Sequence, residues 1–283
     1  MASIGRDDPT GGVADESGPI VNADQQGMDT SNPDTRGTVT APAEPVAAAS
    51  VGADATSAAA RFGFWVAIAT SAMTVLTFAL AITALPNKVE YPFTSEEIVA
   101  QWPGDYYWMW PAMALMVLFV ALVAALHELA PARRRVFSRL AFGLAVIAAA
   151  VLLIDYYIQA TVMQLNLEKG QLDGWSILTQ YNPNGVFIAL EELGYLLMSV
   201  VFVCLVPVFT GRTGLDRAIR WLLLASFAAT VVSLVLVSVW MGIDRGDVFE
   251  IIVISIVWLT LVAAGPLLAV RFRRATSQAA ARP

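Results

Sequence analysis

The chain has 283 residues, of which 57% are hydrophobic and only 14% are charged. Both fractions depart from the averages of soluble domains and indicate a membrane protein with several spanning helices. The net charge of −6 arises in the first 60 residues, which hold nine acidic and two basic side chains, and it gives no reason to expect nucleic-acid binding. The single cysteine and single histidine exclude an internal disulfide and make a zinc, haem or other metal cofactor unexpected.

Residues 1–60 are rich in Gly, Pro, Ala, Ser, Thr and Asp and contain hardly any large apolar side chain. Such a segment cannot bury enough surface to offset the entropy of ordering it, so we predict a disordered acidic cytoplasmic tail. The segment lacks the basic start and apolar core of a signal peptide. It is either a solvated tail or a docking segment for a partner protein.

Six apolar segments follow, each long enough for a helix to cross a hydrocarbon core of about 30 Å. They cover about residues 62–85, 106–129, 136–162, 183–209, 218–241 and 248–270. The sequence therefore predicts an all-α, polytopic membrane protein, with a bundle of six transmembrane helices over residues 61–274 and a short cytoplasmic tail over residues 275–283. Pro266 lies inside the last segment, where a proline is tolerated if neighbouring groups satisfy the backbone atoms it leaves free.

The distribution of basic and aromatic residues indicates how these helices are oriented. One side of the predicted bundle carries Lys88, Lys169 and Arg245, whereas the other carries twelve basic residues: Arg61, Arg133, Arg134, Arg135, Arg139, Arg212, Arg217, Arg220, Arg271, Arg273, Arg274 and Arg282. Basic loops mark the cytoplasmic face, so both termini are expected in the cytoplasm. An interfacial aromatic belt is expected at the outer end of the second segment, from Tyr106, Tyr107, Trp108 and Trp110.

Three carboxylates, Asp155, Glu191 and Glu192, lie inside the third and fourth predicted helices. Charges at such depth are costly and usually face the bundle interior or a wet cavity. With a rise of 1.5 Å per residue, Asp155 lies roughly 24 Å beyond Arg139, in the outer third of the membrane. Glu191 and Glu192 follow Asn182, the predicted N-cap of the fourth helix, by two to three turns. All three acids are therefore expected at one level.

Polar neighbours complete a candidate ligand-binding pocket. Gln159 follows Asp155 by one turn and Tyr195 follows Glu191 by one turn, so each pair shares a helix face. Glu192 is rotated by about 100° from Glu191, so both cannot point to one spot, and at least one should face a different helix. Arg245 is the only arginine predicted on the outer side, so it can pair with one of the acids but not with all. The candidate ligand-binding residues are Asp155, Tyr156, Gln159, Asn182, Glu191, Glu192 and Tyr195.

Two interpretations of these residues remain open. In the first, the pocket faces outward and binds or carries a small cation, a proton or an amine-bearing ligand, with cation–π contacts to tyrosine. In the second, the acids only lock helices together in a structural or regulatory membrane subunit that acts through helix packing and its tail. No catalytic residue is assigned, because the sequence lacks the usual hydrolase and phosphate-binding motifs. An intramembrane hydrolase that uses paired acids is the least favoured alternative.

Three motifs carry a resemblance to known proteins: Asp155-Tyr156-Tyr157-Ile158-Gln159, Asn182-Pro183-Asn184-Gly185 and Glu191-Glu192-Leu193-Gly194-Tyr195. With them, about residues 61–274 resemble uncharacterised six-helix integral membrane proteins of bacteria and archaea. The resemblance implies a six-helix fold and a multi-pass location in the plasma membrane of a prokaryote. It implies no activity, because none is assigned to such proteins.

Overall fold

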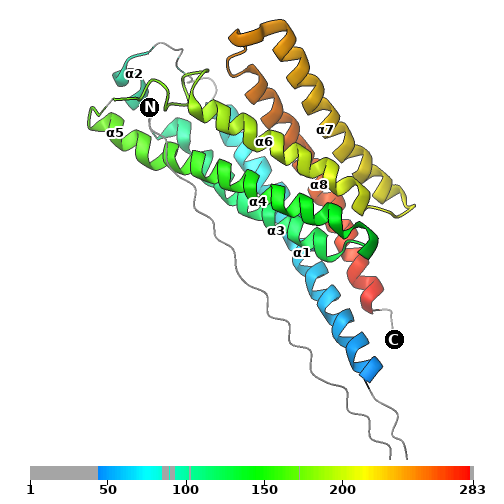
Figure 1. Cartoon of the computed structure of the whole chain (residues 1–283). Helices are drawn as coiled ribbons and strands as arrows, with labels where there is room; N and C mark the ends of the chain where they lie inside the picture. The colour runs from blue at the N-terminus through cyan, green and yellow to red at the C-terminus, as the bar shows by residue number, and fades with distance from the viewer. Residues whose placement is uncertain (1–43, 85–88, 90–92, 102, 172, 281–283) are drawn as a thin grey trace, which may run out of the picture. The chain divides into compact units, whose positions relative to one another are not determined.

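The structure, a computed structural model, describes residues 44–280 except 85–88, 90–92, 102 and 172. All regular structure in this part of the chain is helical (Figure 1). Six of the described segments are long and apolar enough to cross a membrane: Ser57–Ala84, Gly104–Glu128, Ala132–Asn166, Val186–Val208, Gly214–Asp244 and Val248–Gln278. The predicted all-α fold with six transmembrane helices is therefore confirmed, and the helices are those of a multi-pass integral membrane protein.

The first and last helices extend beyond the predicted segments. α1 (Glu44–Ala84) includes residues 44–60, which the sequence analysis assigned to the tail. Eight of these 17 residues are alanine, the residue with the highest helix propensity, which explains the extension. α8 (Val248–Ala280) likewise continues past residue 274. The rest of the predicted tails, residues 1–43 and 281–283, lies outside the described residues.

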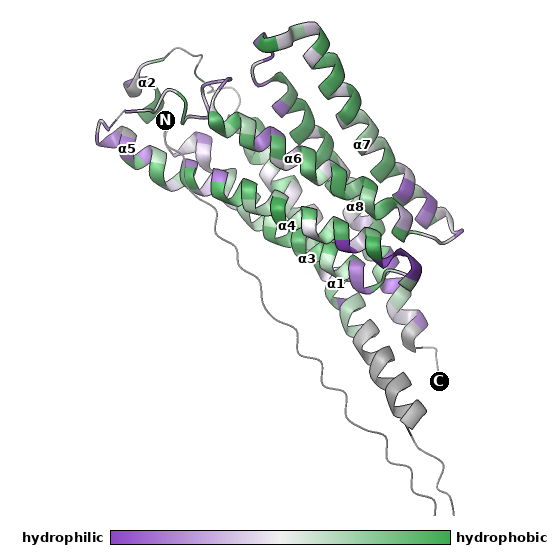
Figure 2. Cartoon of the chain, in the orientation of Figure 1, coloured by the Kyte–Doolittle hydropathy of each residue, from purple (hydrophilic) through white to green (hydrophobic). Residues whose placement is uncertain are grey.

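Five long helices enclose the core of the bundle. They are α1, α3 (Met109–Glu128), α4 (Arg135–Tyr157), α6 (Val186–Leu205) and α8. α1 packs against α3 and α8, α4 packs against α3 and α6, and α6 packs against α8, so the five form a closed ring. α7 (Gly214–Met241) packs outside this ring, against α6 and α8 (Figure 1). Apolar residues occupy most of the length of α7, as expected for a helix in lipid (Figure 2).

Short elements connect the long helices and distinguish the two ends of the bundle. The loop end, as we call it, carries α2 (Ser95–Val99), η2 (Gly104–Tyr106), η4 (Ile158–Met163), α5 (Gln164–Glu168) and η6 (Gly242–Asp244). The basic end carries η3 (Ala132–Arg134), η5 (Val206–Val208) and arginines of the connections and of α8. Of the three basic residues predicted for the loop end, Lys169 and Arg245 are described there, and Lys88 lies outside the described residues.

α1 and α8 approach closely around Pro266. Proline has no N–H, so the carbonyl of Val262, four residues earlier, lacks its helical donor. The hydroxyl of Ser71 on α1 donates to this carbonyl at 3.0 Å, as expected for a proline tolerated in a membrane helix. A Cβ on Gly265 would lie 2.5 Å from the Cβ of Ser71 and 2.8 Å from the carbonyl oxygen of Ala67, so glycine is required for this approach.

α4 and α6 are neighbours, as the sequence predicts for consecutive antiparallel helices. The face of α4 toward the bundle carries small buried residues, among them Ala141, Ala145 and Ala148. On α6, a Cβ at Gly194 would lie 2.4 Å from Cγ of Leu152. Small side chains allow helix backbones to approach in lipid, where close packing holds a bundle together. This close packing sets the polar residues of the two helices opposite each other.

Candidate functional site

The buried carboxyl groups of α4 and α6 meet at the loop end. Asp155 is fully buried and Glu191 is only 2% exposed. The side-chain amide of Gln159 donates to Oδ2 of Asp155 at 3.1 Å and to Oε1 of Glu191 at 3.4 Å. One amide therefore joins an acid of α4 to an acid of α6. The prediction that Asp155 and Glu191 lie at one level between neighbouring helices is confirmed.

Gln159 lies on a segment that departs from α-helical geometry. Residues 158–163 form the π-helix η4, which continues α4 into α5 without a break. Such segments are rare and frequently occur at functional sites, because the wider turn displaces side chains from α-helical positions. Here the π-helix buries Gln159, Ala160 and Met163. It therefore holds the amide that bridges Asp155 and Glu191.

Glu192 faces away from the Asp155–Glu191 pair. Its carboxylate forms an ion pair with Arg245, just after η6 in the connection between α7 and α8. The guanidinium of Arg245 also lies 5.7 Å from the ring centroid of Phe249. The prediction that the two adjacent glutamates face different helices, with Arg245 available to one of them, is confirmed.

An aromatic cluster occupies the middle of the ring of helices. The hydroxyls of Tyr156 and Tyr195 are 2.8 Å apart, and Nε1 of Trp258 donates to the Tyr195 hydroxyl at 3.1 Å. The ring of Trp108 meets those of Tyr156 and Trp258 edge to face, and Phe78 meets Trp258 in the same way. Each helix of the ring thus contributes one aromatic side chain at or near the same depth: Phe78 from α1, Trp108 from the start of α3, Tyr156 from α4, Tyr195 from α6 and Trp258 from α8.

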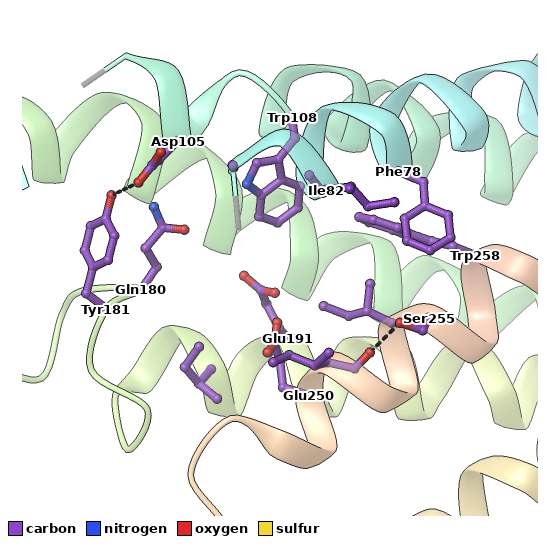
Figure 3. A pocket seen from close by; sticks show the side chains of 15 residues that line it. Phe78, Ile82, Asp105, Trp108, Gln180, Tyr181, Glu191, Glu250, Ser255 and Trp258 are labelled. Carbon is purple, nitrogen blue, oxygen red and sulfur yellow. Dashed lines mark hydrogen bonds between the residues drawn. The ribbon is translucent and has the colours of Figure 1, made fainter. Parts of the chain in front are cut away.

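A pocket of about 130 Å³ lies beside this cluster, toward the loop end (Figure 3). Its wall includes three carboxyl side chains and four aromatic ones: Asp105, Glu191 and Glu250, with Phe78, Trp108, Tyr181 and Trp258. The other described lining residues are small, aliphatic or uncharged polar, and none of those described is basic. The carboxyl groups of Glu191 and Glu250 lie next to each other in the wall (Figure 3).

Asp105 and Tyr181 are hydrogen-bonded neighbours in the lining of the pocket. The Tyr181 hydroxyl donates to Oδ2 of Asp105 at 2.8 Å, and both side chains are buried. Burial raises the pKa of Tyr181 well above its usual value, so the phenol stays protonated and keeps donating at neutral pH. The ring of Tyr181 packs edge to face against Phe93 and Tyr106. The loop before α6 is thereby fixed to the start of the second membrane span.

The predicted aromatic belt is wrong for two of its four residues. Tyr106 and Trp108 are only 3% and 9% exposed, and they face the bundle interior. Tyr107 and Trp110 are 55% and 49% exposed, as a belt requires. The reason is helical periodicity, because Tyr107 and Trp110 are three residues apart and share the outward face, whereas Tyr106 and Trp108 lie on the faces turned inward. Amino-acid composition alone does not distinguish the buried aromatic residues from the exposed ones.

Asn182 has a different role from the predicted N-cap. α6 begins at Val186 with Gly185 as its N-cap. The side-chain oxygen of Asn182 accepts the N–H of Asn184 at 2.9 Å, and its amide donates to the carbonyl of Ser176. Asparagine bonds its own downstream backbone readily, and here that preference forms a turn before the helix. Asn182 thus shapes the loop that carries Tyr181.

The seven predicted site residues fall into three groups. Glu191 lines the pocket, and the amide of Gln159 links it by hydrogen bonds to Asp155, which does not line the pocket. Tyr156 and Tyr195 belong to the aromatic cluster. Glu192 and Asn182 bond other parts of the chain. Asp105, Trp258 and Phe78 also line the pocket, but they were not among the predicted site residues. In the sequence, each is only a polar or aromatic residue within or beside an apolar segment, which does not by itself indicate a site.

Comparisons with protein-family models, with curated proteins and with solved structures found no match. Among the described residues, no group of three or more His, Cys, Asp or Glu side chains is placed to hold a metal ion. An acidic pocket with aromatic walls is instead suited to a ligand that combines positive charge with apolar surface.

Proposed function

We propose that the protein binds a small organic cation, a protonated amine or a quaternary ammonium ion, in the pocket at the loop end. The observation that carries this proposal is the composition of the pocket lining. Three carboxyl side chains and four aromatic rings line the pocket, and none of its described lining residues is basic. Such a wall attracts positive charge and repels anions.

The size of the pocket limits the ligand. Its volume of about 130 Å³ is slightly smaller than that of cavities known to hold one benzene-sized molecule. A headgroup such as tetramethylammonium is of this order, whereas a drug-sized molecule needs several hundred cubic ångströms. We therefore place the ligand among the smallest organic cations, or the cationic end of a longer molecule.

The carboxyl and aromatic groups have separate roles in this proposal. Glu191 and Glu250 supply negative charge in a wall shielded from water, where electrostatic attraction is stronger than in solution. The faces of Trp and Tyr rings attract a desolvated cation by about 2 kcal/mol. Carboxylates alone would also suit inorganic cations, and the aromatic rings favour an organic one.

The distribution of charge supports an orientation for the site. We place the basic end in the cytoplasm because arginine-rich connections are retained there. Both termini then lie inside, and the pocket lies in the outer part of the membrane. In line with the resemblance of the sequence, we assign the protein to the plasma membrane of a prokaryote.

A second candidate role is favoured by the bridge through Gln159. This amide links the carboxyl groups of α4 and α6, which is also what a purely structural clamp would do. The protein would then be a structural or regulatory subunit, and its buried acids would stabilise the bundle without a ligand. The two roles differ in what happens when Glu191 loses its charge.

Binding of tetramethylammonium to the full-length protein in lipid nanodiscs tests the proposal, with isothermal calorimetry as the measurement. Tert-butanol, a neutral molecule of nearly the same shape, and sodium chloride serve as ligand controls. Glu191→Gln should weaken binding at least about tenfold, because one partner of a poorly solvated charge pair is removed. Glu168→Gln is the matched control, since Glu168 is an exposed acid at the same end of the bundle.

The two roles predict opposite patterns. For a binding protein, wild type and Glu168→Gln bind the cation alike, tert-butanol does not bind, and Glu191→Gln retains its fold. For a clamp, no cation binds to any variant and Glu191→Gln lowers the unfolding temperature. Equal binding of tert-butanol and tetramethylammonium would also contradict the proposal, because the carboxylates would then contribute nothing.

A further inference from the structure

We propose that the cation is exchanged for a proton held by the buried pair Asp155 and Glu191. The inference rests on the proposed function and deepens it, because it assigns a second occupant to the same site. When the pocket is empty, one proton is shared by the pair. When the cation binds, that proton leaves.

Donors and acceptors around Gln159 do not match in number. Asp155 on α4 is completely buried, and Gln159 on η4 is 1% exposed. The Gln159 amide nitrogen donates to both acids, yet Oδ1 of Asp155 and Oε1 of Gln159 have no hydrogen-bond partner. Buried acceptors without a donor are rare and costly. A carboxylic O–H on the pair supplies the missing donor.

Glu191 belongs to two environments. It accepts a hydrogen bond from Gln159 inside the protein, and it also lines the pocket (Figure 3). A neutral acid suits the buried pair, since two carboxylates in a poorly solvated site repel each other. An ionised acid suits a cation in the pocket. One carboxyl group therefore couples the charge of the pocket to the protonation of the pair.

No described side chain around the pair supplies a positive charge to balance it, so a proton is the fitting counter-charge for the two acids. The titratable groups beside the pair are Tyr156 on α4, Tyr195 on α6 and Glu250 on α8. Asp105 on η2 lines the same pocket and bonds Tyr181. All of these are acids or phenols, so none supplies positive charge. Arg245, the nearby guanidinium, forms its ion pair with Glu192. The described residues also offer no cluster suited to a metal ion.

The exchange needs no reagent besides water and the cation. On binding, the O–H bond of the carboxylic acid breaks and the proton passes to water. Both electrons of that bond stay on the carboxylate, which then neutralises the cation. On release the carboxylate takes a proton from water, and net charge in the site is conserved through the cycle.

Proton release from the full-length protein in nanodiscs tests the inference, measured with a pH indicator in weakly buffered solution. Tetramethylammonium should release about one proton per bound cation, and the apparent affinity should fall roughly tenfold for each pH unit below neutrality, as linkage requires. Asp155→Asn removes one carboxyl group of the pair and keeps its shape. This variant should still bind the cation, with proton release reduced by more than half, while Glu168→Gln should behave as wild type.

The outcomes separate the two proposals. Binding without proton release, or with a sodium dependence in place of a pH dependence, overturns the exchange and leaves the binding function standing. An absence of binding overturns both. Wild-type proton release from Asp155→Asn would show that the proton is held elsewhere and overturns the assignment. If Asp155→Asn fails to fold, infrared difference spectra of wild type decide: a carboxylic C=O band should disappear on binding, and its persistence refutes the exchange.

Discussion

Glu191 and Glu192 are adjacent in sequence and have unrelated surroundings. Glu191 contacts the Gln159 amide and the pocket, whereas Glu192 pairs with Arg245 outside the core of the ring. A helix turns by about 100° per residue, so two successive side chains cannot serve one site. Each residue therefore contributes a different interaction: Glu191 couples the interior to the pocket, and Glu192 ties α6 to the connection before α8.

Tyr195 is the residue through which three helices are hydrogen-bonded at the centre of the bundle. Tyr195→Phe removes the hydroxyl that contacts Tyr156 and accepts from Trp258. We expect a loss of about 1–2 kcal/mol in the free energy of unfolding, because buried polar groups on α4 and α8 lose their partner. Detergent-induced unfolding followed by tryptophan fluorescence measures this loss.

Tyr107→Phe is the control for Tyr195→Phe. It makes the same chemical change at a side chain that is 55% exposed, so its unfolding free energy should match wild type. If both variants lose the same stability, the buried hydroxyl contributes nothing beyond a surface one, and the described hydrogen-bonded chain is not stabilising.

At the scale of single residues, the sequence predicted the acids better than the aromatic side chains. A carboxylate within an apolar segment has few acceptable surroundings, so Asp155 and Glu191 could be assigned to the interior in advance. A tryptophan at a helix end is acceptable both in the interface and in the core. Trp108 was therefore assigned to the interface although it lies in the core, and the aromatic half of the pocket became apparent only from the fold.

At the scale of elements, α8 shows how a proline is accommodated in a membrane helix. Pro266 frees the Val262 carbonyl, Ser71 of α1 donates to it, and Gly265 lets α1 come close enough to do so. These three residues act as one unit, since the hydrogen bond requires the close approach. The contact between α1 and α8 closes the ring around the pocket.

Gly265→Ala tests this contact. The added Cβ would overlap Ser71 and the backbone carbonyl of Ala67, and backbone cannot move aside as a flexible side chain can. We expect a loss of about 1–3 kcal/mol in unfolding free energy, the usual range for overpacking. The same unfolding measurement detects it.

Gly143→Ala on α4 is the matched control, because a Cβ at Gly143 meets no atom within 4 Å. Alanine also favours a helix over glycine by about 1 kcal/mol, so this variant should be unchanged or slightly more stable. An equal loss in both variants would mean that close approach of α1 and α8 is not what Gly265 provides.

The elements themselves were predictable, and their packing was not. Hydropathy locates six spans because lipid requires long apolar helices. Lipid is also as apolar as the core, so no amphipathic pattern marks the inner face of a helix. The sequence thus gave no indication that α7 lies outside the ring. The proximity of α4 and α6 was predicted correctly because they are consecutive membrane spans. Asn182 was wrongly predicted to be the N-cap of α6, because asparagine uses the same hydrogen-bonding chemistry in a turn and at an N-cap.

At the scale of the whole molecule, the two ends of the bundle differ in charge, and the proposed function uses only one of them. Arginines gather at one end, and the acidic pocket lies toward the other. In the proposed function, a cation that enters the pocket meets Asp105 and Glu250 in its wall. If the basic end lies in the cytoplasm, as we propose, the ligand reaches the pocket from the outer side of the membrane.

Cysteine labelling in intact cells tests this orientation. Cys204 is the single cysteine, so Cys204→Ala provides a cysteine-free background with no expected labelling. Asp173→Cys then reports on the loop end and Gly214→Cys on the basic end, since both positions are exposed. A membrane-impermeant maleimide should label Asp173→Cys in intact cells and Gly214→Cys only after permeabilisation, because basic connections stay in the cytoplasm. The reverse pattern would place the pocket on the cytoplasmic side, and the ligand would then have to be a cytoplasmic cation.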